Sequence, residues 1–270
     1  MLYQYGFTLG MKLIRRGRWR DSIRYIVIPV NYWRAIEYQL VARAASFQQG
    51  DTVLDIGSPK LLSLYLADVV GAEVFSTDIE DYFIRGYELL RRIQHVPSRR
   101  FHLKVEDGRH LTFADNAFTK VYSISVLEHI PDRGDTACAA EIGRVLAPGG
   151  TAVITVPFAP VSRDEYSKPR FYWHRSSQAQ GDGLVFYQRR YSEGDLFRRL
   201  IEPSGLQLRR LAYVGERFSV GSDHELCDFL PKPTGPIQPL VSRVAHTEPQ
   251  DSWRKLKKPL CALIVLEKPH

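Results

Sequence analysis

The stretch Val53-Leu54-Asp55-Ile56-Gly57 decides the fold, because it is typical of a short buried strand that ends in a carboxylate and a glycine. A second apolar strand follows and ends at Asp78, about twenty residues further on. In parallel α/β sheets, a ligand that carries adenosine binds at the carboxyl ends of the strands. The first loop approaches it closely, and an acid after the second strand accepts hydrogen bonds from the ribose. Alone, this pair of signals is weak, since turn chemistry also explains it.

Strand-like and helix-like segments alternate along the rest of the chain. Parallel neighbouring strands need helical crossovers, so the alternation predicts an α/β fold with a doubly wound, mainly parallel, seven-stranded sheet. The expected strands are residues 52–56, 73–77, 101–104, 120–124, 151–156, 206–214 and 260–267. The expected helices are residues 61–70, 82–93 and 137–146, and order is also expected over 192–202.

Two regions lack this periodicity. Residues 158–185 are rich in proline, serine, arginine and aromatic residues, which predicts a long surface insertion. The aromatic and cationic side chains between Tyr166 and His174 either form a lid over a flat or apolar ligand or pack onto the sheet edge. Residues 215–259 are expected to be irregular, apart from a helix start at Ser222-Asp223-His224-Glu225, which has the spacing of a capping box.

The first fifty residues carry most of the positive charge. They hold eight Lys and Arg residues against two acidic ones, so +6 of the net +7 lies there. Asn31 is the expected N-cap of a helix, and an amphipathic basic segment precedes it. We therefore separate a basic helical segment, 1–50, from a domain over 51–270. The segment either caps the active site or contacts a membrane or another phosphate-bearing surface, although a solvated helix face is the commoner outcome.

The location follows from the apolar stretches and the cysteines. Arginines interrupt the apolar stretches of the N-terminal segment, so neither a signal peptide nor a transmembrane helix is expected. Cys138, Cys227 and Cys261 are odd in number and widely spaced, which favours reduced thiols over a zinc site or a disulfide framework. The expectation is a cytoplasmic protein, with peripheral membrane contact left open.

Four further motifs follow in order along the expected sheet. They are residues 105–108 (Val-Glu-Asp-Gly), 113–118 (Phe-Ala-Asp-Asn-Ala-Phe), 121–130 (Val-Tyr-Ser-Ile-Ser-Val-Leu-Glu-His-Ile) and 144–150 (Arg-Val-Leu-Ala-Pro-Gly-Gly). This series resembles the class I S-adenosylmethionine (SAM)-dependent methyltransferases, in particular the small-molecule group that includes ubiquinone-biosynthesis enzymes. The similarity covers about 53–158 and extends through 187–214, and it implies a Rossmann-like methyltransferase fold.

The resemblance also implies a set of SAM-binding residues at the strand ends. Asp55 and Gly57 would border the methionine and ribose portions, and Asp78 would accept hydrogen bonds from the ribose hydroxyls. Asp107 would read the adenine amino group, and Ser125 would lie beside the methyl donor. The full expected set is Asp55, Gly57, Ser58, Lys60, Asp78, Ile79, Asp107, Gly108 and Ser125.

The first loop departs from the family pattern. Members usually carry three glycines there, whereas this chain has Pro59 and Leu61 in the second and third places. Proline is harmless in the first turn of a helix, because its missing N–H has no partner there. Lys60 is then a candidate partner for the carboxylate of SAM. The alternative is a weakened site.

Methyl transfer by direct displacement needs alignment more than a catalytic side chain, and a base is required only if the acceptor must lose a proton. His129, after the fourth strand, is the best-placed base, although a histidine that packs the following helix is the commoner case. His174 in the insertion is the second candidate. Some relatives bind a divalent metal through Glu-x-x-Glu-His. Ser125 stands in place of the first glutamate here, so no metal site is expected.

The sequence therefore predicts a SAM-dependent methyltransferase that acts on a small-molecule or lipid-like metabolite. A nucleic-acid methyltransferase is a second hypothesis, favoured by the basic N-terminal segment. It is disfavoured because the turn after the fourth strand lacks an Asn/Asp-Pro-Pro-aromatic motif and the chain has no Pro-Cys pair. A methyltransferase-like binding or scaffold protein without turnover is the third. The oligomeric state and the acceptor are not predicted.

Overall fold

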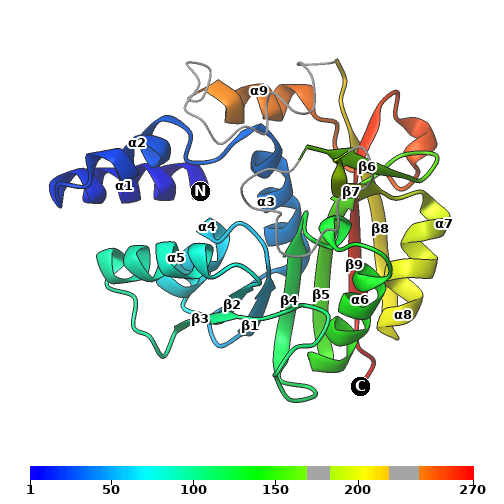
Figure 1. The fold of residues 1–270 in the computed structure, drawn as a ribbon, viewed down its shortest axis with the longest axis horizontal. Helices are drawn as coiled ribbons and strands as arrows, with labels where there is room; N and C mark the ends of the chain where they lie inside the picture. The colour runs from blue at the N-terminus through cyan, green and yellow to red at the C-terminus, as the bar shows by residue number, and fades with distance from the viewer. Residues whose placement is uncertain (169–182, 219–236) are drawn as a thin grey trace.

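The computed structural model describes residues 1–168, 183–218 and 237–270, and its centre is a seven-stranded sheet in the order β3-β2-β1-β4-β5-β9-β8 (Figure 1). All neighbouring strands are parallel except β9, which is antiparallel to both β5 and β8. The predicted mainly parallel α/β fold is therefore confirmed. The strands of this sheet are β1 (Thr52–Ile56), β2 (Glu73–Asp78), β3 (Phe101–Val105), β4 (Phe118–Ile124), β5 (Leu146–Pro157), β8 (Gln207–Gly215) and β9 (Pro259–Glu267).

Helices cover both faces of the sheet, as crossovers between parallel strands require. The crossover after β1 is α4 (Leu61–Tyr65), which continues as a π-helical turn over Leu66–Val70. The later helices are α5 (Asp81–Gln94), α6 (Gly134–Val145), α7 (Glu193–Asp195), a π-helical turn (Leu196–Ile201), α8 (Glu202–Ser204) and α9 (Gln238–Ala245). The helices and ordered segment expected between the strands are confirmed, with ends that differ by a few residues.

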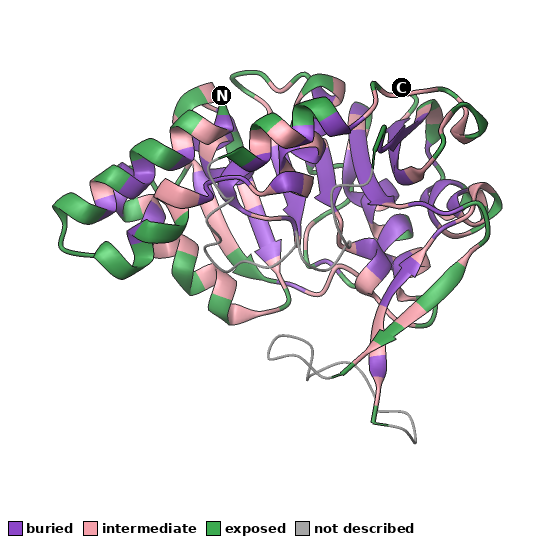
Figure 2. Cartoon of the chain, turned by 90° about the horizontal axis from the view of Figure 1, so that it is seen from above, coloured by how far each residue is buried: buried purple, intermediate pink, exposed green. Residues whose placement is uncertain are grey.

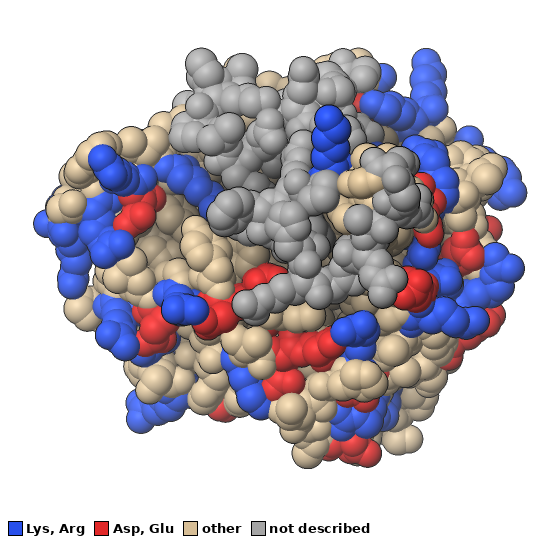
Figure 3. Space-filling model, viewed as in Figure 1, with Lys and Arg blue, Asp and Glu red and all other residues tan. Residues whose placement is uncertain are grey.

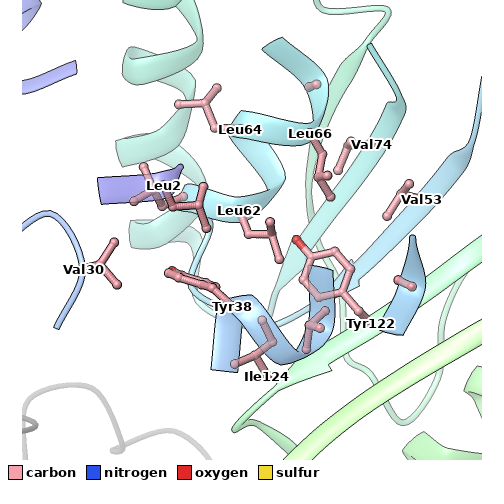
Figure 4. Packing of buried hydrophobic residues seen from close by; sticks show 14 of the residues in the cluster. Leu2, Val30, Tyr38, Val53, Leu62, Leu64, Leu66, Val74, Tyr122 and Ile124 are labelled. Carbon is pink, nitrogen blue, oxygen red and sulfur yellow. The ribbon is translucent and has the colours of Figure 1, made fainter. Parts of the chain in front are cut away.

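The apolar residues of the strands form two cores, one on each face of the sheet. Neighbours in β1 illustrate this, because Val53 packs into one cluster and Leu54 into the other, as the alternation of strand side chains requires. The second cluster includes α6. In the first, Leu62 of α4 and Tyr38 of the N-terminal region lie together beside the sheet (Figure 4). The N-terminal helices therefore share a core with the sheet.

The N-terminal segment folds into α1 (Leu2–Arg15), α2 (Trp19–Val27) and α3 (Tyr32–Ala45). The first two form a helical hairpin that projects from one end of the molecule, with its tip exposed (Figures 1 and 2). Gly10 allows their close approach, since a Cβ there would lie 2.7 Å from Cγ1 of Ile26. Asn31 caps α3 as predicted, with its side chain accepting a hydrogen bond of 2.9 Å from the backbone of Arg34.

Two elements lie where irregular chain was expected. A hairpin of β6 (Arg163–Ser167) and β7 (Val185–Arg190) forms at the two ends of the predicted insertion. Helix α9 lies within the predicted irregular region and packs against α3. The predicted capping box at 222–225, Cys227 and His174 lie outside the described residues. In the described ranges, no helix is both long and apolar enough to cross a membrane.

Candidate functional site

The carboxyl ends of four parallel strands bring the predicted site residues to one edge of the sheet. Strand pairing sets Ile56 beside Thr77 and Asp78 beside Val105, so the loops after β1, β2 and β3 leave the sheet side by side. Strand β4 pairs with the other side of β1 and leads directly to Ser125. The order along the edge is therefore the loop after β3, the loop after β2, the loop after β1 and the loop after β4.

Asp55 is fully buried, and its carboxylate binds groups of the protein itself. One carboxylate oxygen accepts the backbone N–H of Ser58 at 3.0 Å. The other accepts the hydroxyls of Ser63 at 2.5 Å and Ser76 at 2.6 Å. Ser58 is also buried, and its hydroxyl accepts the backbone N–H of Ile124 at 2.8 Å. Both residues shape the first loop and tie it to β4.

Lys60 is buried as well, with 1% of its surface exposed. Its ammonium donates to the backbone carbonyls of Thr77 at 2.6 Å and Ser58 at 2.9 Å. It lies 3.3 Å from a carboxylate oxygen of Asp78 and 3.6 Å from one of Asp55. The ammonium thus links the ends of β1 and β2 and is turned away from solvent. This arrangement does not support the expected contact between Lys60 and the carboxylate of SAM.

Asp78 and Ile79 present a carboxylate and an apolar surface next to each other. The side chain of Asp78 is 12% exposed, and burial raises its pKa while Lys60 opposes that rise. One of its oxygens accepts the backbone N–H of Glu80 at 3.1 Å. Ile79 is 52% exposed, which is unusual for a large apolar residue at the end of a buried strand. Together they offer hydrogen-bond acceptors beside an apolar contact.

Asp107 lies after β3 and is paired with Arg109. The guanidinium contacts both carboxylate oxygens, at 2.6 Å and 3.0 Å, and these hydrogen bonds lower the pKa of Asp107. The backbone N–H of Arg109 also donates to Asp107, at 2.9 Å, so Arg109 supplies three donors. Because a carboxylate has about four lone-pair sites, Asp107 has the capacity for one further hydrogen bond. Gly108 is closely packed, since a Cβ there would lie 3.1 Å from both Cys138 and Ile56.

The loop after β1 touches the loop after β4 at Gly57. A Cβ on Gly57 would lie 2.7 Å from Cγ1 of Val126, and the residue has a φ of +66°. Glycine is therefore required both by the backbone conformation and by the contact. Ser125 also has a positive φ, of 50°. Such a conformation is uncommon in a non-glycine residue, although Ser46 and His95 also adopt it where helices end.

Glu37 of α3 is a site residue that the sequence analysis missed. Its buried carboxylate accepts hydrogen bonds from the hydroxyl of Ser125 and, at 3.2 Å, from that of Thr155 in β5. The guanidinium of Arg34, one turn earlier, donates to its other oxygen at 2.5 Å. Glu37 thus brings a negative charge to the end of β4. Its place in the sequence contains no local signal for this, because Ser125 is 88 residues away.

Glu128 and His129 lie on the turn after β4. Glu128 is buried, and burial raises its pKa to about 8. The Nδ1 atom of His129 lies 2.6 Å from the carbonyl of Tyr187. Because a carbonyl only accepts, Nδ1 carries the proton, and Nε2 lies 3.8 Å from Glu128. Burial lowers the pKa of His129 to about 4. His129 therefore packs against β7 and presents an unprotonated nitrogen to Glu128.

A small cavity lies beside Pro59 in the first loop, with a volume of about 40 Å³. Its lining combines the two cationic side chains of Arg24 and Arg34 with the tyrosines Tyr25, Tyr38 and Tyr87. This lining suits a compact anionic group such as a carboxylate. In the part of the chain that the structure describes, no three His, Cys, Asp or Glu residues lie close enough together to hold a metal ion.

Comparison with known families finds a match within the sheet. A family described as "Methyltransferase domain" matches residues 54–154. This range begins in β1 and ends in β5, so it contains the strand ends and loops described above.

Two curated proteins illustrate the relatives. Phosphoethanolamine N-methyltransferase 2 of Caenorhabditis elegans is 29% identical over 153 residues, which are 56% of this chain and 31% of that protein. Sterol 24-C-methyltransferase of Pneumocystis carinii is 26% identical over 152 residues, 55% of this chain and 37% of that protein. The chain thus spans about a third of the length of these relatives.

Among solved structures, the [4+2]-cyclase SpnF superposes with a TM-score of 0.57. The superposition covers 100% of this chain and 96% of that one, at 14% sequence identity. The superposition indicates a shared fold. At an identity this low, it carries no argument about the reaction.

Proposed function

Because this chain belongs, through residues 54–154, to the class I SAM-dependent methyltransferases, we propose that it transfers a methyl group from SAM to a small-molecule or lipid-like acceptor. The observation that carries the proposal is the row formed by Asp78, Ile79 and Asp107 at neighbouring strand ends. Two partly exposed carboxylates there accept hydrogen bonds from ribose hydroxyls and an adenine amino group, and Ile79 offers apolar contact to the base.

The other end of SAM carries a carboxylate, and we assign it to Arg24 and Arg34. Both line the cavity beside Pro59, and Arg34 also donates to Glu37 through one nitrogen of its guanidinium. Lys60 lies outside that lining and contacts Asp78 and two backbone carbonyls. A guanidinium binds a carboxylate more specifically than an ammonium does, since it donates two parallel hydrogen bonds. Asp55, Ser58 and Lys60 then act indirectly, by holding the first loop in shape.

When bound, SAM supplies a methyl group on a positively charged sulfur, which is transferred by displacement. The residues of this chain align the two reactants and exclude water. Glu37, which is ion-paired with Arg34, accepts the hydroxyl of Ser125 and so orients that side chain at the end of β4. His129 remains our candidate for a base, because its Nε2 lies on the side away from the Tyr187 carbonyl. Its low pKa keeps this nitrogen unprotonated and also makes it a weak proton acceptor.

The test is calorimetry of the whole chain with SAM and S-adenosylhomocysteine. We expect both to bind, and Asp78→Ala to weaken each by at least about tenfold, because hydrogen bonds to a charged group contribute about 1.5–3 kcal/mol. Asp81→Ala is the matched control, since Asp81 is an exposed acid on the neighbouring helix that pairs only with Arg85 among the described contacts. The absence of binding of either ligand to the wild type would refute the enzyme proposal.

The same titration separates a second candidate, a methyltransferase-like binding protein without turnover. The specific observation that favours it is the ion pair between Lys60 and Asp78, which already occupies part of the ribose-binding carboxylate. Tight binding of SAM without methyl release on incubation with lipid and metabolite extracts would support it. A nucleic-acid acceptor predicts instead RNA or DNA binding that weakens steeply as salt is raised.

We further propose that residues 1–50 carry the membrane-surface element of a methyltransferase domain over 51–270, and that this element is the α1–α2 hairpin. Six of the sixteen exposed large apolar side chains of the described residues lie in the first 23 residues: Met1, Phe7, Met11, Ile14, Trp19 and Ile23. Four arginines lie between Ile14 and Asp21, at the tip of the α1–α2 hairpin. Figure 3 shows basic side chains gathered at this end of the molecule. Apolar side chains among arginines favour an anionic lipid surface.

Vesicle sedimentation tests this element. We expect binding to phosphatidylcholine vesicles that contain phosphatidylglycerol and weak binding to phosphatidylcholine alone. The double variant Ile14→Ser, Trp19→Ser should bind at least about tenfold more weakly, because each buried apolar side chain contributes about 1.5–3 kcal/mol. Leu240→Ser, on the exposed face of α9, is the control. Equal loss in the control, or no preference for anionic vesicles, would contradict the proposal.

A further inference from the structure

Two unsatisfied polar atoms belong to neighbouring side chains, one on α3 and one on the residue that follows α9. In the ranges 1–168, 183–218 and 237–270, the buried side-chain atoms without a hydrogen-bond partner are Trp33 Nε1, His246 Nε2 and Glu128 Oε2. The rings of Trp33 and His246 are in edge contact, with centroids 5.4 Å apart. Buried polar atoms are normally paired, so two such atoms in neighbouring side chains indicate a site.

The geometry around His246 defines what its free nitrogen can do. Its Nδ1 atom lies 2.9 Å from the carbonyl of Ser242 and 3.1 Å from the hydroxyl of the same residue. Because the shorter contact is with a carbonyl, which only accepts, we assign the proton to Nδ1, and the hydroxyl then accepts there too. The ring is 3% exposed and also packs against Tyr32, with centroids 4.6 Å apart. Burial lowers the pKa of His246, which keeps the ring neutral. Nε2 therefore carries a lone pair, and the contacts of the ring with Ser242 and Tyr32 fix the direction in which it points.

Neighbouring charged groups do not satisfy this pair. Glu216, which is bridged to His246 through the backbone, accepts the hydroxyl of Tyr32 at 2.9 Å and the ammonium of Lys258 at 2.7 Å. Glu37, one turn after Trp33 on α3, is engaged by Arg34, Ser125 and Thr155. The carboxylates on both sides are thus committed to other partners.

The pair lies at the same edge of the sheet as the proposed SAM site, over its other half. Strand β8 is antiparallel to β9, which is antiparallel to β5, so β8 ends at the edge where β5 ends. Glu216, directly after β8, brings His246 to that edge. Helix α3 spans the gap, because it contacts β4, β5, β9 and α9. Residues i and i+4 of a helix share a face, so Trp33 lies next to Glu37, which contacts Ser125.

We propose that Trp33 and His246 bind a hydroxyl group of the methyl acceptor. A hydroxyl oxygen accepts from the indole N–H, and its proton is donated to Nε2 of His246, so one group satisfies both atoms. A carboxylate or a fully ionised phosphate has no proton to donate to Nε2, and an ammonium group has no lone pair to accept from the indole. The subsite therefore selects a compound with a group that both accepts and donates a hydrogen bond, as a hydroxyl does. It rests on the proposed function only in naming that compound the methyl acceptor.

The test uses phenol and toluene, which differ only in the hydroxyl group. The readout is the indole N–H signal of Trp33 in a ¹H–¹⁵N NMR spectrum of the whole chain, assigned through Trp33→Phe. We expect a saturable shift with phenol and none with toluene. No shift with phenol, which would mean that water satisfies the pair, overturns the proposal. Equal shifts with both compounds overturn it as well.

A variant separates this inference from the proposed function. His246→Phe keeps a ring against Tyr32 and removes the acceptor nitrogen, so phenol should bind about tenfold more weakly while calorimetry with SAM is unchanged. Unchanged phenol binding in that variant overturns the subsite and leaves the SAM site standing. If the wild type does not bind SAM, the proposed function is refuted instead. If His246→Phe does not fold, the comparison of phenol with toluene on the wild type still decides.

Discussion

Replacing Lys60 with methionine tests whether this residue stabilises the fold by linking β1 to β2 or binds SAM directly. Methionine has a similar length and removes the charge. The ammonium of Lys60 donates to two backbone carbonyls at 2.6 Å and 2.9 Å and lies 3.3 Å from Asp78. If the structure is right, the main effect is on folding stability. If Lys60 bound the carboxylate of SAM, the main effect would be on SAM affinity.

The magnitude follows from the burial of the group. Lys60 is 1% exposed, so its removal leaves the carbonyls of Thr77 and Ser58 with one donor fewer and Asp78 without its cation. Breaking a buried ion pair costs about 3–5 kcal/mol. We expect the lower end, about 3 kcal/mol, because Asp78 is partly exposed and can be rehydrated. In a chain of this size, that loss lowers Tm by on the order of 10 °C.

The assay is urea unfolding followed by circular dichroism, with calorimetry of SAM binding on the folded variant. Lys255→Met is the matched control. Lys255 donates to Asp251 at 2.6 Å, but both side chains are exposed, so its loss should cost no more than about 0.5 kcal/mol. Equal stability of the two variants would refute the internal role of Lys60. A large loss of SAM affinity with native stability would restore the interpretation made from the sequence.

Three further predictions concern other contacts. Gly57→Ala should lower the free energy of unfolding by about 1–3 kcal/mol, because Gly57 has a φ of +66° and a Cβ there would lie 2.7 Å from Val126. Gly86→Ala, in the middle of α5 with open space around it, should instead raise the free energy of unfolding by about 0.5–1 kcal/mol. Thermal melts compare the two variants. Asp135→Asn should cost about 3 kcal/mol in urea unfolding, since this buried carboxylate accepts from Arg189, Tyr191 and Arg199; a cost below about 0.5 kcal/mol would contradict it. The pKa of Glu128, raised by burial to about 8, makes the native state hold its proton longer than the unfolded chain. The free energy of unfolding therefore falls as pH rises towards 8, by up to about 1.4 kcal/mol per pH unit. Glu128→Gln should flatten the fall in unfolding free energy between about pH 6.5 and 8. Below about pH 6.5, the lowered pKa of His129 makes the unfolding free energy rise with pH, so that range is avoided. An unchanged slope in the variant would show that another group causes the fall.

Much of the fold was predictable because its signals are local. Short apolar runs and turn residues define the parallel strands, and Asn31 caps α3 through a residue three positions away. The β6–β7 hairpin and α9 were not predicted. The hairpin is held by long-range ion pairs, such as Arg189 with Asp135, and α9 is held by packing on α3. Contacts of this kind leave no period in the sequence.

The site divides in the same way. The sequence indicates that Asp78, Ile79 and Asp107 follow neighbouring strands, and they do lie at one edge of the sheet. Their roles as SAM ligands remain proposals. The sequence does not indicate that Asp55, Ser58 and Lys60 are buried, nor that Glu37 joins the turn after β4. No local pattern distinguishes a carboxylate that faces a ligand from one that faces its own loop.

The sequence by itself determined the order of the elements and which residues end each parallel strand, because hydrophobic period and turn chemistry act over a few neighbouring residues. A parallel sheet then necessarily collects its carboxyl ends at one edge. Only the tertiary structure decided which of those polar groups stay accessible. Burial and hydrogen-bond pairing depend on side chains from distant segments, as Lys60 does on Asp78 and Ser125 on Glu37, so these contacts exist only once the chain has folded.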